Sequence, residues 1–264
     1  MRLGKKWWVI GLLASILILM LLIRNKGILI TKAHPVVIQM EGKRITRRFA
    51  EYETTGSGWF YIYYPENESE TAHMIKSIAE SWGDDVLSFF EFQPDQTINI
   101  VLYAQEDELK GALRIPQSQS AMGAYAGGFV NLISPEEHYS EDEAYEILTN
   151  VFIHEVAHLA LDRIAKGNYP LWFTEGSALY LEYSLLGYEW GKGIIDEPPS
   201  SIDDMTYRFS SLDEQAAYRK SFLMVKDMID TRGQDAYLEF LSLLGNGANF
   251  QEAMTEIYGI DIFS

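Results

Sequence analysis

Apolar and polar positions divide the chain into a long apolar run at its start, a region of short strands and a region of helices. Alternation with many aromatic residues predicts strands over 59–64 and 97–103. Two short apolar pieces, 122–126 and 129–133, are separated by a Gly-Gly pair, which predicts a β-hairpin. Helical spacing predicts helices over 68–90, 106–113, 143–164, 171–185, 212–231, 234–244 and 250–258. Strands that come mostly before helices are the sequence order of an α+β fold.

The apolar run over residues 7–23 predicts a membrane anchor. A bilayer span needs about 20 apolar residues and tolerates about 17, and Trp7 and Trp8 lie where interfacial aromatic residues are expected. A cleaved signal peptide is the alternative, but the run ends in Leu-Ile-Arg and not in a small-residue cleavage site. Basic residues are nearly balanced across the run, and the free α-amino group favours a cytoplasmic N-terminus. We therefore predict a single-pass protein of the cell membrane whose main domain lies outside the cytoplasm.

Composition and charge exclude several classes of function. The 264 residues include no cysteine, which excludes thiol nucleophiles, disulfides and Cys-based metal sites. Residues 27–264 carry 16 basic against 38 acidic side chains, a formal charge of −22 within a whole-chain charge of −17. A chain this acidic repels phosphate backbones, and nucleic acid is therefore not expected as a partner. Cationic peptides, in contrast, can be attracted to it. Solubility alone is the alternative explanation of this charge.

The predicted helix over 143–164 carries candidate metal ligands. It contains His154-Glu155-x-x-His158 among apolar neighbours. At 3.6 residues per turn the two histidines lie one turn apart on one face, so both imidazoles can reach one ion with Glu155 beside them. The alternative is a chance pair of hydrogen-bonded core histidines. Buried imidazoles beside a carboxylate need a polar partner, however, and a cation provides one.

A third ligand is expected, because catalytic zinc normally takes three protein ligands and keeps one position for water. Glu175 is the candidate, in the second turn of the predicted helix over 171–185. An exposed glutamate is the ordinary alternative, but Trp172 and Phe173 before it and Ala178 after it predict a buried helix. We therefore predict Zn²⁺ as the cofactor, with His154, His158 and Glu175 as its ligands.

These residues carry a resemblance to a known family. The motif His154-Glu155-x-x-His158, followed by Pro-Leu-Trp-Phe-Thr-Glu-Gly over 170–176, resembles the peptidase MA-like gluzincins, relatives of thermolysin. The order of strands and helices extends the resemblance over about residues 57–260. It implies a zincin-like α+β fold, in which a small mixed sheet packs on helices and a helical C-terminal part follows. It also implies Zn²⁺ on the three predicted ligands and a sheet edge near 124–130 that receives an extended peptide.

The sequence departs from the family pattern at one position and offers a candidate for the family's second catalytic residue at another. Thermolysin-like enzymes place an Asp four residues after the Glu ligand to orient a histidine, but Leu179 stands at that position here. Asp162 and Ser177 are the substitutes that the sequence offers. The family's transition-state donor is a His or Tyr on a later helix, and Tyr218 occupies the similar place. Packing is the alternative role for Tyr218.

We therefore expect a membrane anchor over 1–26, a stalk or edge segment over 27–56 and a zincin-like peptidase domain over 57–264. The predicted function is zinc-dependent hydrolysis of a peptide or protein substrate, with Glu155 as general base and Tyr218 as the second catalytic residue. The alternative is a membrane-tethered binding or sensory protein that keeps the zincin fold without turnover. The motif also leaves hydrolysis of a non-peptide amide open.

Overall fold

A mixed five-stranded sheet lies in the first half of the chain in the computed structural model, which describes residues 25–49, 51–117, 121–136, 138–195 and 199–259. The strands are β1 (Glu53–Ser57), β2 (Phe60–Tyr64), β3 (Ile98–Tyr103), β4 (Gly123–Ala126) and β5 (Phe129–Ile133). Their order across the sheet is β1-β2-β3-β5-β4. The three central strands are parallel, and each outer strand is antiparallel to its neighbour. β4 is therefore an edge strand.

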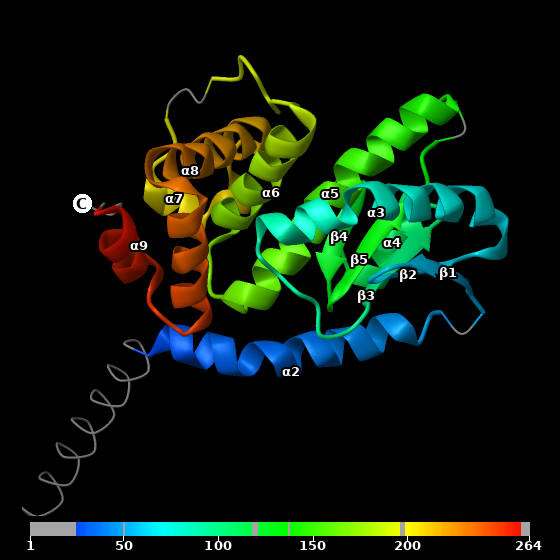
Figure 1. Cartoon of the computed structure of the whole chain (residues 1–264), viewed down its shortest axis with the longest axis horizontal. Coiled ribbons are helices and arrows are strands. Elements are labelled where there is room, and N and C mark those ends of the chain that lie inside the picture. Colours follow the sequence, from blue (N-terminus) through cyan, green and yellow to red (C-terminus); the bar gives the residue numbers. More distant parts are fainter. Residues whose placement is uncertain (1–24, 50, 118–120, 137, 196–198, 260–264) are drawn as a thin grey trace, which may run out of the picture.

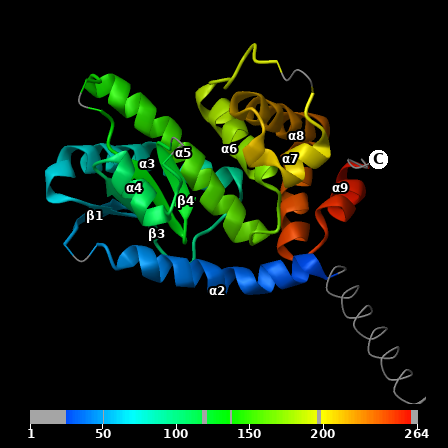
Figure 2. The ribbon, with the colours of Figure 1, turned by 180° about the vertical axis from the view of Figure 1, so that it is seen from behind.

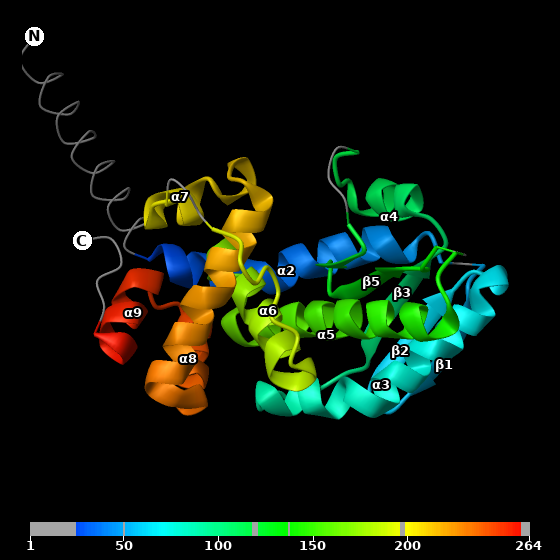
Figure 3. The ribbon, with the colours of Figure 1, turned by 90° about the horizontal axis from the view of Figure 1, so that it is seen from above.

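Helices cover both faces of this sheet. They are α2 (Lys26–Thr46), α3 (Ser69–Phe89), α4 (Glu106–Leu113) and α5 (Glu141–Ala165). α3 and α5 pack on one face, and α2 and α4 lie on the other side of the sheet (Figure 1, Figure 3). The larger core lies between the sheet, α3, α5 and the later helices, whereas a smaller core that includes Ile45, Val101 and Phe129 lies under α2 and α4.

The second half of the described chain is helical. α6 (Leu171–Leu186), α7 (Ile202–Tyr207), α8 (Glu214–Gly245) and α9 (Phe250–Tyr258) follow α5, with short 3-10 helices at Glu66–Glu68 and Phe209–Ser211. α6 packs against both α5 and α8 (Figure 2). The predicted α+β class is therefore confirmed, with a small mixed sheet on helices and a helical C-terminal part.

Local sequence signals define the ends of α5 and α6. The Ser140 hydroxyl accepts a hydrogen bond from the Glu143 backbone N–H, and the Glu143 carboxylate accepts one from the Ser140 backbone N–H, which together form a capping box. Lys166 adopts a left-handed conformation at the end of α5, and Pro170 is the N-cap of α6. The short connection between them brings α6 directly against α5.

The structure differs from the predicted elements near the start of the described chain, and it agrees with them in α8. Residues 26–46 form helix α2, whereas the sequence predicted a stalk or edge segment over 27–56; the strand β1 begins within that segment. Pro35 inside α2, together with apolar residues on its exposed side, hid the helical pattern. The two helices predicted over 212–231 and 234–244 correspond to the two parts of α8, which are separated by a kink at Gly233, where the backbone is not helical (φ 82°, ψ 168°).

The predicted membrane anchor over 7–23 lies outside the described residues. Among the helices that the structure does describe, none has both the length and the apolar composition to cross a bilayer. The first of them, α2, carries several basic side chains, which are costly in a bilayer core. This finding contradicts the predicted single-pass location and leaves the predicted membrane contact without support. The division into segments 1–26, 27–56 and 57–264 stays a prediction.

Candidate metal centre

Three side chains from α5 and α6 bring their donor atoms together. The imidazole centroids of His154 and His158 are 4.7 Å apart. The Oε2 atom of Glu175 lies 3.4 Å from His154 Nε2 and 3.6 Å from His158 Nε2. One donor atom from each residue lies within 4.8 Å of the other two. The structure thus brings together the three residues that the sequence predicted as ligands.

The remaining ring nitrogen of each histidine has its own partner. His154 Nδ1 lies 2.6 Å from Glu182 Oε1, and His158 Nδ1 lies 2.6 Å from Thr174 Oγ1. Such hydrogen bonds fix the orientation of a metal-binding imidazole and direct its free nitrogen toward the ion. Both Nε2 atoms therefore face Glu175.

The residues that orient the histidines are not those that the sequence suggested. Asp162 instead accepts hydrogen bonds from the hydroxyls of Tyr125 and Tyr169, at 2.8 and 2.7 Å, and pairs with His34 at 2.9 Å. The Ser177 hydroxyl donates to the Phe173 carbonyl at 2.6 Å.

Glu182 and Thr174, which do contact the histidines, were missed by the sequence reasoning. A signal for Glu182 was present, because it follows Glu175 by seven residues, or about two helical turns, and so lies on the same face of α6. Thr174 directly precedes Glu175, and spacing alone did not show that its hydroxyl meets an imidazole.

The donor set fits a zinc ion. Two imidazole nitrogens and one carboxylate oxygen are ligands that zinc takes in catalytic sites, and three protein ligands leave a position for water. Each histidine already has its second nitrogen bonded, as expected of metal-binding imidazoles. The predicted cofactor, Zn²⁺, is therefore borne out by the chemistry of the site.

Burial and close charges shift the pKa values of these ligands. Burial alone would raise the pKa of Glu175, but the charge on His158 and hydrogen bonds from both histidines hold it well below its usual range. Burial opposes a charged His154, but hydrogen bonds to Glu175 and Glu182 outweigh this effect and raise its pKa. The site therefore favours a positive charge between these carboxylates.

Glu155 lies beside the ligands with a buried carboxylate, since the residue is only 6% exposed. Its Oε2 atom has no hydrogen-bond partner among the described residues. Burial raises the pKa of Glu155, whereas the charges of His154 and His158 and a hydrogen bond from the Tyr125 backbone lower it. Tyr125 belongs to β4, so the carboxylate lies at the edge of the sheet. A buried carboxylate oxygen without a partner is a group that can accept a proton from a molecule in the site.

Tyr218 on α8 also approaches the site. Burial raises the pKa of its hydroxyl, and the negative charges of Glu175, Glu214 and Glu155 raise it further. The phenol therefore stays protonated close to the metal ligands and can donate a hydrogen bond there. The structure thus brings Tyr218 to the same site as Glu155 and Glu175, which the sequence could not establish.

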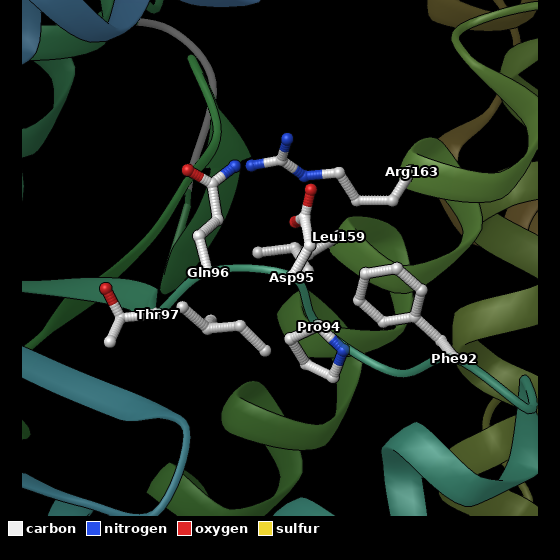
Figure 4. A pocket seen from close by; sticks show the side chains of 8 residues that line it. Phe92, Pro94, Asp95, Gln96, Thr97, Leu159 and Arg163 are labelled. Carbon is white, nitrogen blue, oxygen red and sulfur yellow. The ribbon is translucent and has the colours of Figure 1, made fainter.

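A separate small hollow lies between residues 92–98 and α5 (Figure 4). Leu159 and Arg163 of α5 and Asp95 and Gln96 of the connecting segment line it. The residues predicted for the metal site do not line this hollow, so it is distinct from the metal centre.

A close helix crossing holds α6 and α8 together beside the metal centre. A methyl group at Gly176 would lie 2.2 Å from the Ser221 carbonyl oxygen and 2.8 Å from Val225 Cγ2. We expect Gly176→Ala to lower the free energy of unfolding by about 1–3 kcal/mol through overpacking, measured by thermal or urea unfolding. Gly111→Ala is the matched control, because a methyl group at this helical position meets no atom within 4 Å. It should raise stability by roughly 0.5–1 kcal/mol, and equal effects of the two changes would contradict the close crossing.

Comparisons with known proteins agree with this site. The model of the Peptidase MA superfamily matches residues 90–264, so the chain belongs to this superfamily. No curated protein matches the sequence. The resemblance to peptidase MA-like gluzincins is thereby confirmed, and family and site together define a metallopeptidase-like protein.

Several solved structures are similar in part. Leukotriene A4 hydrolase of Saccharomyces cerevisiae is 13% identical, with a TM-score of 0.48 over 79% of this chain and 36% of that chain. An aminopeptidase A of Legionella pneumophila is 13% identical, with a TM-score of 0.49 over 80% of this chain and 27% of its own. An M1 zinc metallopeptidase of Deinococcus radiodurans is 15% identical, with a TM-score of 0.37 over 80% of this chain and 50% of its own. This chain therefore spans half or less of the length of each.

Proposed function

We propose that the protein is a zinc-dependent metallopeptidase that hydrolyses peptide bonds in a peptide or protein substrate. His154, His158 and Glu175 hold the metal ion, Glu155 is the general base and Tyr218 is a hydrogen-bond donor. The observation that carries the proposal is the convergence of three ligand atoms within 4.8 Å beside the buried Oε2 of Glu155, which has no hydrogen-bond partner in the part of the chain that the structure describes.

Each residue has a distinct task in this mechanism. When bound, Zn²⁺ supplies a water molecule whose pKa is lowered to about 7 and polarises the substrate carbonyl. Glu155 accepts a proton from the attacking water and then delivers it to the leaving amine. The Tyr218 hydroxyl donates a hydrogen bond to the carbonyl oxygen as negative charge develops on it. Glu182 and Thr174 hold the two imidazoles in orientation throughout.

The edge strand β4 supplies the place for an extended substrate. The Tyr125 backbone in β4 is hydrogen-bonded to Glu155, so a chain aligned along this edge passes close to the general base. Addition of a strand to an exposed sheet edge is a common mode of peptide binding, because backbone groups provide the hydrogen bonds. Gly123 lets β4 lie this close to Glu155, because a methyl group there would lie 2.6 Å from Val151 Cγ1 and 3.0 Å from Glu155 Cγ, both on α5.

The alternative is a binding or sensory protein in which zinc only clamps the fold. Structural zinc sites are normally closed by four protein ligands, and the cluster found among the described residues has three. The Oε2 atom of Glu155 is buried beside the cluster without a hydrogen-bond partner among the described residues, and a structural zinc site does not need such an atom, which favours catalysis. The same arrangement permits hydrolysis of a non-peptide amide, so a substrate screen includes such compounds.

Removal and return of the metal tests the proposal. We expect the purified protein to contain one zinc ion per chain and to cleave members of a broad peptide library. Prolonged chelation should abolish cleavage, and stoichiometric Zn²⁺ should restore it, because the ligands persist while the activated water is lost. Zinc content is measured by elemental analysis and cleavage by mass spectrometry. A protein that retains one zinc ion per chain and cleaves no peptide would favour the alternative, in which zinc has only a structural role.

A further inference from the structure

The ring of Tyr218 contacts two aromatic rings from the connection between α6 and α8. The Phe209 ring centroid lies 5.6 Å from the Tyr218 ring centroid, and the Trp190 ring centroid lies 5.9 Å from it. Phe209 belongs to a short 3-10 helix and is buried. Trp190 lies in a segment without helix or strand, so its ring depends on side-chain tethers for its position.

Arg219, the residue after Tyr218, provides such a tether. One guanidinium nitrogen donates to the Trp190 carbonyl at 2.9 Å, and another donates to the Glu189 carboxylate at 2.8 Å. The guanidinium carbon also lies 5.2 Å from the centre of the Phe222 ring. The side chain of Arg219 is only 12% exposed. A planar guanidinium that bonds two acceptors holds both in a defined geometry, which a lysine cannot do.

The turn after Trp190 packs against the Arg219 side chain. Gly191 has a positive φ of 64°, and a methyl group there would lie 3.3 Å from Arg219 Cδ. The Ile194 backbone N–H donates to the Gly191 carbonyl at 2.9 Å and closes the turn. The segment is thus folded over the stem of Arg219 with the Trp190 ring against Tyr218.

We propose that Arg219 is a positioning residue for the donor Tyr218. By holding Glu189 and the Trp190 carbonyl, it keeps the Trp190 ring against Tyr218 and thereby keeps the phenol directed at the metal centre. This inference rests on the proposed function. The contacts of Arg219 described above are to the connecting segment and to Phe222, so its effect on catalysis passes through Tyr218.

A double-mutant cycle in the full-length zinc-loaded protein tests this role. Tyr218→Phe should lower kcat by about 10²-fold, the usual cost of removing a donor to the transition state. Arg219→Met should lower kcat by about tenfold with little change in KM, because displacement by a fraction of an ångström weakens a transition-state contact. In the Tyr218→Phe background Arg219→Met should have no further effect on kcat, because the Tyr218 hydroxyl through which Arg219 acts is already absent.

The matched control is Lys226→Met on the same helix. Lys226 also forms an ion pair, with Asp230, and also lies over an aromatic ring, that of Tyr183 at 5.5 Å. It should leave kcat unchanged in both backgrounds. Equal losses from Arg219→Met with and without the Tyr218 hydroxyl would overturn the proposal, and so would a wild-type kcat in Tyr218→Phe.

A second measurement needs neither metal nor substrate. In zinc-free protein labelled with 3-fluorotyrosine, the Tyr218 resonance is assigned as the one that Tyr218→Phe removes. Arg219→Met should shift or broaden this resonance, whereas Lys226→Met should leave it in place. An unmoved resonance would show that Arg219 does not hold Tyr218. Zinc-loaded wild-type protein without peptidase activity would instead contradict the proposed function, and the resonance would still decide whether the tether exists.

Discussion

Glu155→Gln is expected to lower kcat for peptide hydrolysis by about 10²–10⁴-fold, the usual contribution of a general base. The glutamine side-chain amide has nearly the same shape as the glutamate carboxylate, but it cannot take a proton from water. The substitution removes the basicity of the buried Oε2 atom, which has no partner among the residues that the structure describes. Initial rates on a peptide that the wild-type protein cleaves would measure the effect.

The metal content of this variant is its internal control. Glu155 is not among the three clustered donors, so Glu155→Gln protein should still bind one zinc ion per chain. Inactive protein with full zinc occupancy separates loss of the base from loss of the metal. A zinc-loaded variant that cleaves at the wild-type rate would exclude Glu155 as general base and with it the proposed mechanism.

Glu182→Gln is expected to weaken zinc binding by about 10–100-fold, the usual cost of losing a partner of a metal-binding histidine. The carboxylate lies 2.6 Å from His154 Nδ1 and is 5% exposed, so its charge acts on the imidazole with little screening by solvent. Glutamine can still accept one hydrogen bond but carries no charge to raise the basicity of the ring. Competition with a chromophoric chelator would measure the zinc Kd.

Glu146→Gln supplies the comparison for this change. Glu146 lies on α5, two turns before His154, and its side chain is exposed. Its replacement removes the same formal charge from the same helix and should leave the zinc Kd unchanged. If both variants bind zinc equally well, the contact between Glu182 and His154 does not contribute to metal affinity.

Elements with strong local patterns could be predicted from the sequence. The hairpin of β4 and β5, with its Gly-Gly turn, and helix α9 lie at the predicted residues or within one of them. Here the apolar period, the turn residues and the caps all favour one structure, so local preference and tertiary packing agree. Helix α2 was missed because its exposed side carries apolar residues and Pro35 interrupts its pattern. Only packing on the sheet and the contact of His34 with Asp162 reveal its role.

The sequence by itself determined that His154 and His158 share one helix face, because four residues make about one turn in any α-helix. It also identified Glu175 as the candidate third ligand from the burial of its neighbours. Only the tertiary structure decided that Glu182 and Thr174 orient the imidazoles and that Tyr218 meets Glu175. These contacts join separate elements, and their geometry depends on how α5, α6 and α8 cross. Close approaches such as Gly176 against Ser221 set that crossing, and no periodicity along the chain encodes it.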